Sequence, residues 1–144
     1  MQLSEHFTYE EAIASQTASR LGIDNHPSSE ILSNMESAAN QLEKIRMALG
    51  QPISVSSWYR CQALNVAVGG VGKSAHTTGW AIDLNCYKFG TLKEVVTAVV
   101  TEGVPFDQVI WEFDSWCHIS FAPAMRNQVL TIHRGTGYMN GLVD

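Results

Sequence analysis

Two histidines and an aspartate stand in patterns that could hold a metal ion. Asp83 and His118 each lie in a segment where apolar and polar residues alternate, and His76 precedes the first of these segments. Because side chains two apart share one face of a strand, Asp83 and His118 should point away from the apolar side. A buried charge without a partner is strongly destabilising. A shared metal ion would supply that partner.

The donor types favour a catalytic zinc site. Imidazole nitrogens and a carboxylate oxygen suit Zn²⁺, and three protein ligands leave the fourth tetrahedral position for water, as in catalytic rather than structural sites. Non-haem iron uses the same set of two histidines and one carboxylate. The ligand types alone therefore leave the metal open.

A second motif, in the segment 67–74, is a relaxed match to a phosphate-binding loop. The stricter pattern has glycine where Ala67 stands, and such a loop follows a buried strand and opens a helix. Here the preceding residues, Cys61 to Val68, have the pattern of a short helix, and Thr77-Thr78-Gly79 would interrupt a helix after the loop. We therefore favour a glycine-rich turn over a nucleotide-binding loop.

The first half of the chain is predicted to be helical. Thr8 with Glu11, and later Thr91 with Glu94, have the spacing of capping boxes at helix starts. Apolar residues recur at three- and four-residue steps before Gly50, which stands where a long helix would end. Helices are expected from about Tyr9, over 29–49, and from Thr91 to about Val100.

The second half is predicted to be mainly strands. Apolar residues alternate with polar ones, as in half-buried strands, in 53–56, 81–84, 108–113, 116–121 and 129–132. The fold class is therefore α+β, with N-terminal helices packed on a small, largely antiparallel sheet. We expect one domain over residues 1–144, with a glycine-rich tail that is loosely ordered from about residue 135.

Composition excludes several partners. The 144 residues include 9 Lys+Arg and 14 Asp+Glu, a net charge of −5, which argues against nucleic-acid binding. Three cysteines form no disulfide framework or zinc knuckle. No segment has the pattern of a signal peptide or a membrane span. We expect a monomer, made in the cytoplasm without a signal peptide and not inserted in a membrane.

A series of ordered motifs runs along most of the chain, from Leu3 to about Ile132. The motifs are Ser56-Ser57-Trp58-Tyr59-Arg60, Leu64-Asn65, Val68-Gly69-Gly70, Ser74-x-His76-x-x-Gly79-x-Ala81-x-Asp83 and Trp116-x-His118-x-Ser120. Together they resemble the peptidase M15 family of zinc D-Ala-D-Ala carboxypeptidases and phage endolysins. The resemblance implies a fold related to the hedgehog signalling domain.

The same resemblance assigns roles to residues. His76, Asp83 and His118 would be the ligands of one zinc ion per chain, and Arg60 would sit at the substrate carbonyl or carboxylate. The substrate would be a peptidoglycan stem peptide. Zinc lowers the pKa of a bound water towards about 7 and polarises the scissile carbonyl, so this water would be the nucleophile.

Two further residues are candidates for binding substrate. Ser74 opens the motif that carries the first histidine. Trp58 stands where relatives usually have glycine, so its ring could line the groove or cap the core.

The sequence leaves the identity of the general base open. Relatives carry an acid three residues before the last histidine, and this chain has Ser115 there. Glu112 is our first candidate. A hairpin centred on Ser115 would place Glu112 opposite His118, whereas a two-residue turn at Asp114-Ser115 would pair Trp111 with His118. Asp114 is the second candidate for the base and a candidate substrate contact.

The resemblance to the peptidase M15 family implies a zinc-dependent peptidoglycan peptidase. The bond cleaved would be that of a D-Ala-D-Ala carboxypeptidase, or that of an L-Ala-D-Glu or cross-link endopeptidase. A phage or prophage lysin acting on the cell wall or in the periplasm fits such an enzyme. The alternative is a non-catalytic, zinc-stabilised module that binds the cell wall.

Overall fold

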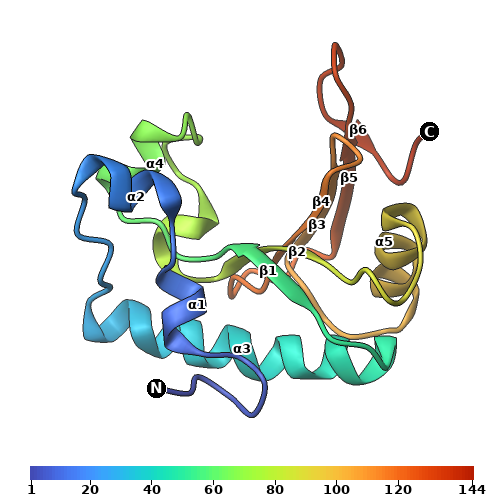
Figure 1. Cartoon of the computed structure of the whole chain (residues 1–144). Coiled ribbons are helices and arrows are strands. Elements are labelled where there is room, and N and C mark those ends of the chain that lie inside the picture. Colours follow the sequence, from blue (N-terminus) through green and yellow to red (C-terminus); the bar gives the residue numbers. More distant parts are fainter.

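One six-stranded sheet organises the chain, which the computed structural model describes from residue 1 to residue 144 (Figure 1). The strands are β1 (Ser54–Ser57), β2 (Ala81–Asn85), β3 (Gln108–Glu112), β4 (Trp116–Ser120), β5 (Gln128–Ile132) and β6 (Met139–Asn140). They lie in the order β1-β2-β4-β3-β5-β6, and only β3 and β5 pair in parallel. The predicted α+β class with a largely antiparallel sheet is confirmed.

The helices include every one predicted from the sequence. They are α1 (Tyr9–Ile13), α2 (Gln16–Leu21), α3 (Ser29–Leu49), α4 (Gln62–Ala67), the 3₁₀ turn η1 (Ala75–Thr78) and α5 (Leu92–Thr101). Both predicted capping boxes form, at Thr8 and Thr91. The short α2 was not predicted, because it buries only Ala18 and so has no apolar stripe. None of the helices is long and apolar enough to cross a membrane.

The two faces of the sheet have different surroundings. One face packs its apolar side chains, among them Ile82, Leu84 and Ile119, into a core shared with α3 and α5. Figure 1 shows α3 running below the sheet and α5 beside it. The other face carries Asp83 and His118, which lie directly opposite each other on β2 and β4. The alternation predicted from the sequence is therefore confirmed on both strands.

The hairpin between β3 and β4 differs from both predicted registers. Glu112 pairs with Trp116, and Ile110 pairs with His118, so the pairing is centred on Asp114. In the three-residue turn, Phe113 and Asp114 both adopt left-handed conformations, with φ of 53° and 47°, and Ser115 N–H donates to the carbonyl of Glu112 at 2.9 Å. Glu112 is therefore diagonal to His118 instead of opposite, yet it lies on the same face of the sheet.

The C-terminal tail, predicted to be loosely held, makes contacts with the sheet. β6 pairs with β5, and the buried Thr131 forms hydrogen bonds with the backbone that follows β6. The Thr131 hydroxyl donates to the carbonyl of Gly141 at 2.7 Å and accepts the N–H of Val143 at 3.1 Å. One buried hydroxyl thus satisfies two backbone groups of the tail.

We predict that Gly79→Ala destabilises the fold more than Gly22→Ala. Both glycines end helical turns in the left-handed conformation, with φ of +83° and +67°. A Cβ on Gly79 would lie 2.7 Å from Met35 Cγ and 3.1 Å from the carbonyl oxygen of Ile31, whereas one on Gly22 would meet nothing within 4 Å. Each change should cost about 1 kcal/mol of backbone strain, and Gly79→Ala a further ~1–3 kcal/mol of overpacking. Equal losses in urea unfolding would contradict this.

We also predict a pH-dependent contribution from Asp107, which is 3% exposed. Arg126 donates to it from its backbone N–H and Nε, each at 3.0 Å, and from Nη2 at 2.9 Å, and these bonds hold the pKa of Asp107 below its usual range. Because the pKa of Asp107 is lower in the folded than in the unfolded protein, its ionised form stabilises the fold above the unfolded-state pKa of about 4. This stabilisation is lost as the pH falls through the folded-state pKa.

Asp107→Asn should therefore lower the free energy of unfolding by about 1.5–3 kcal/mol at pH 7 and by less at pH 3. Urea unfolding at both pH values measures the difference, with the exposed Asp144→Asn as control. The same loss at both pH values would show that the charge of Asp107 does not contribute.

Candidate metal centre

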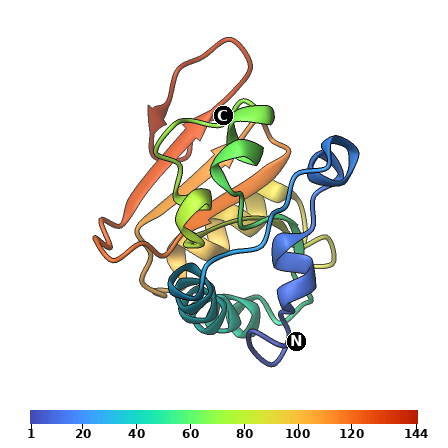
Figure 2. The ribbon, with the colours of Figure 1, turned by 90° about the vertical axis from the view of Figure 1, so that its left-hand side faces the viewer.

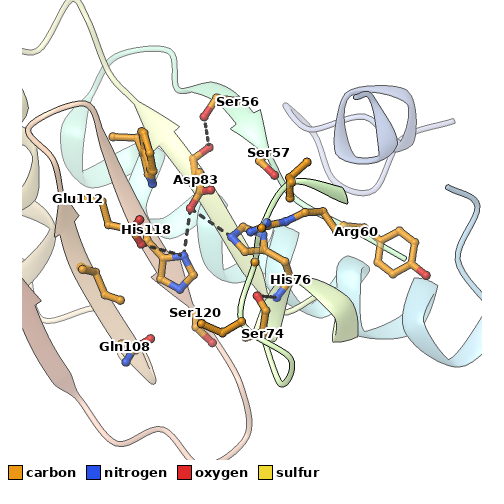
Figure 3. A pocket seen from close by; sticks show the side chains of 18 of the residues that line it. Ser56, Ser57, Arg60, Ser74, His76, Asp83, Gln108, Glu112, His118 and Ser120 are labelled. Carbon is orange, nitrogen blue, oxygen red and sulfur yellow. Dashed lines mark hydrogen bonds and ion pairs between the residues drawn. The ribbon is translucent and has the colours of Figure 1, made fainter. Parts of the chain in front are cut away.

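Three buried side chains from separate elements meet on the face of the sheet that lies opposite the core. His76 lies in η1, Asp83 in β2 and His118 in β4. The Oδ1 atom of Asp83 is 3.3 Å from His76 Nε2 and 3.0 Å from His118 Nδ1. Figure 3 shows both imidazoles pointing at the Asp83 carboxylate. The structure thus brings together the three residues that the sequence singled out.

Local backbone contacts set the orientation of His76. The hydroxyl of Ser74 accepts the N–H of His76 at 3.2 Å and caps η1. His76 Nδ1 lies 2.6 Å from the carbonyl oxygen of Trp58, to which it can only donate. The other ring nitrogen, Nε2, is then the free acceptor and faces Asp83. A histidine whose second nitrogen is fixed by a carbonyl is typical of metal ligands.

The geometry of the three side chains fits a zinc ion. Their donor atoms all lie within 4.8 Å of one another. Ligand atoms about 2.0–2.2 Å from a tetrahedral zinc are themselves about 3.3–3.6 Å apart, close to the 3.0 and 3.3 Å observed here. Burial would raise the pKa of Asp83, but His76 and His118 outweigh it and hold that pKa well below its usual range. Asp83 is thus ionised and could serve as a metal ligand.

Glu112 lies beside this centre without binding it directly. Its Oε1 atom is 3.8 Å from His118 Nδ1, and its side chain is 16% exposed. Burial raises the pKa of Glu112, and the negative charge of Asp83 adds to the shift, while His118 opposes it. A carboxylate with a raised pKa next to a metal centre is suited to accept and return a proton.

Arg60 approaches the centre from the opposite side of the groove. Its side chain extends toward His76 and Asp83 (Figure 3). Its Nε is buried without a hydrogen-bond partner, and a Cβ on Gly70 would lie 3.0 Å from its Nη1. Burial lowers the pKa of Arg60, although the carboxylates of Asp83 and Glu112 oppose this shift. The guanidinium remains charged and offers unpaired donors to a ligand.

Two other candidates lie away from the groove. The Trp58 ring is 1% exposed in the core and donates from Nε1 to the carbonyl of Gly79 at 2.9 Å, so Trp58 contributes its carbonyl rather than its ring. Asp114 accepts a hydrogen bond from Nε1 of the buried Trp111 at 3.0 Å and does not line the groove. Asp114 is thus directed away from the centre, which leaves Glu112 as the adjacent carboxylate, and Ser74 does line the groove.

The centre lies in a groove of about 1170 Å³. Its floor is the polar face of the sheet, and its opposite wall includes α4 and the glycine-rich turn 69–73, which lie in front of the sheet in Figure 2. That turn follows a helix, as expected for a segment that is not a phosphate-binding loop.

The groove also contains residues that the sequence reasoning missed. They are Gln108, Arg126, Gln128 and Tyr138. Alternation with Glu112 along β3 would have identified Gln108. The others depend on β5 and on the chain around β6, whose pairing partners no local pattern predicts.

The match to known proteins covers the segment that builds this centre. A search of curated proteins finds no match to the chain. Residues 5–120 match the family model described as Peptidase M15. This range includes His76, Asp83, His118, Arg60 and Glu112, as the sequence motifs predicted. The chain therefore belongs to the peptidase M15 family.

Proposed function

We propose that this chain is a zinc-dependent peptidase that hydrolyses a peptide bond in the stem peptide of peptidoglycan. The observation that carries the proposal is the convergence of His76, Asp83 and His118 within 4.8 Å on the groove face, with Glu112 and Arg60 beside them. Three protein ligands leave a position open for a reacting group, which is the arrangement of a catalytic zinc site.

Each residue has a defined task in this proposal. A zinc ion held by the three ligands would act as a Lewis acid and would make water nucleophilic near neutral pH. Glu112 takes the proton of the attacking water and returns it to the leaving amine. Arg60 directs its donors at the carbonyl oxygen or a carboxylate of the substrate, where negative charge develops or resides.

The local charge of the groove suits an anionic peptide. The chain has a formal charge of −5, but Arg60 and a bound Zn²⁺ would place positive charge at the centre of the groove. We propose that the enzyme is a phage or prophage lysin that acts on the cell wall. The bond is that of a D-Ala-D-Ala carboxypeptidase or of an endopeptidase, and mass spectrometry of digested muropeptides identifies which.

Metal removal should abolish activity and lower stability. We expect one zinc per chain by elemental analysis of the purified protein. Zinc at a hundred times its dissociation constant stabilises the folded state by about 2.7 kcal/mol, so a chelator should lower the melting temperature. His118→Ala should lose the zinc, and His26→Ala, which changes an exposed histidine, should keep it. A melting temperature that zinc leaves unchanged, without stoichiometric metal, contradicts the proposal.

Glu112→Gln should separate catalysis from metal binding. Loss of the base should reduce turnover of muropeptides about 10²–10⁴-fold, while the zinc content stays at one per chain. Asp114→Asn, a change in the same hairpin that does not reach the groove, is the matched control. Unchanged turnover in Glu112→Gln would remove Glu112 as the base. A wild-type protein that binds muropeptides but never cleaves them would instead be the wall-binding module.

A further inference from the structure

The floor of the groove is organised in rows that cross the sheet. One row contains the centre and consists of Asp83, His118, Ile110 and Leu130. The next row consists of Ala81, Ser120, Gln108 and Gln128. Figure 3 shows Gln108 and Ser120 on the same face as His118. The second row is thus a polar extension of the floor on the side away from Glu112.

Arg126 lies beyond this polar row, where neighbouring residues hold its side chain in place. It lines the groove, and Asp107, which is 3% exposed, binds its Nε and Nη2 through both carboxylate oxygens. The neighbours Met125 and Asn127 both adopt left-handed conformations, with φ of 45° and 56°. Asn127 also donates to the carbonyl of Phe106 at 3.1 Å. The turn thus holds Arg126 in one orientation.

The other edge of the guanidinium is free. The Nη1 group of Arg126 makes no hydrogen bond, and the side chain is 53% exposed. A guanidinium fixed on one edge loses little conformational entropy when its free edge binds a ligand. Carboxylates are the planar partners that match guanidinium donors. Asp107 therefore acts as a support that leaves Arg126 able to bind a second carboxylate.

The two ends of the groove differ in charge. Phe113, Trp116 and Tyr138 line it near Glu112. Burial raises the pKa of Tyr138, and the negative charge of Glu112 adds to that shift. An anionic group would be repelled there, whereas at the other end the charge of Asp107 is paired with Arg126, whose second edge can still bind an anion. The second row lies two strand residues, about 7 Å, from the row of the centre, and Arg126 lies just before β5, beyond that second row. A peptide extended along the groove would therefore need two or three residues to reach from the centre to Arg126.

We propose that Arg126, supported by Asp107, forms an anion subsite that takes a carboxylate of the substrate peptide two or three residues from the cleaved bond. This inference rests on the proposed peptidase function and adds the requirement for an acidic peptide. The subsite depends on the chain after residue 120, outside the range that matches the family. Gln108 Nε2 donates to Gln128 Oε1 at 2.8 Å, which fixes the polar floor between the centre and the subsite.

The test compares two synthetic stem peptides that differ only in a free carboxylate or a carboxamide on the isoglutamate residue. Isothermal titration on zinc-loaded, full-length Glu112→Gln protein measures binding without turnover. The carboxylate peptide should bind about tenfold more tightly than the carboxamide, as expected for a charge-assisted hydrogen bond. In the Arg126→Gln background the two peptides should bind within twofold of each other.

Two further variants control for folding and for general charge. Arg126→Lys keeps a cation for Asp107 but lacks the second edge of a guanidinium, so it should also lose most of the discrimination while the protein stays folded. Arg134→Gln removes an exposed arginine that does not line the groove, and should keep the tenfold difference. An equal loss of affinity for both peptides in the Arg126 variants would show a structural role only and overturn the subsite.

Cleavage by the wild-type, zinc-loaded protein is measured separately on the same two peptides. Discrimination in binding without any cleavage would support the subsite and contradict the peptidase. Cleavage of both peptides with equal KM would support the peptidase and overturn the subsite. Failure of the zinc-loaded Glu112→Gln protein to bind either peptide would also overturn the subsite.

Discussion

The buried carboxylate of Asp83 is the constraint on which the groove depends. It is ionised, 8% exposed and placed on a central strand, where an unpaired charge would be strongly destabilising. Two imidazoles from different elements meet it, at 3.3 and 3.0 Å. Since the partners of Asp83 must come from η1 and β4, the turn that carries His76 has to pack onto the sheet, and this contact forms the bottom of the groove.

The surroundings of His76 hold it in place independently of a metal. The carbonyl of Trp58 fixes one nitrogen of His76, and the hydroxyl of Ser74 caps its turn. The Trp58 ring in turn donates to the carbonyl of Gly79, the residue that ends η1. The core tryptophan thus connects the hydrophobic interior to the orientation of His76. Such support reduces the reorganisation that metal binding requires.

Local patterns predicted the features that depend on neighbours in sequence. Period-two alternation placed Asp83 and His118 on one face, and capping boxes marked two helix starts. Both predicted registers of the hairpin were wrong, because the turn has left-handed conformations at Phe113 and Asp114 that no local pattern indicated. The face of Glu112 was nevertheless correct, since moving the centre of pairing by one residue shifts the partner by two positions and preserves the side of the sheet.

The features that sequence reasoning missed arise from pairing between distant segments. β5 lies parallel to β3, which brings Gln128 beside Gln108 and the turn with Arg126 against Asp107. Cations and carboxylates therefore both line the groove: Arg60, Lys73 and Arg126 lie there together with Asp83, Asp107 and Glu112. Because a low-dielectric cleft focuses its own charges, the position of each charge in the groove matters more to a bound peptide than the net charge of the chain, which is −5. The fold thereby separates the charge that a partner senses at a distance from the charge that orients a peptide in the groove.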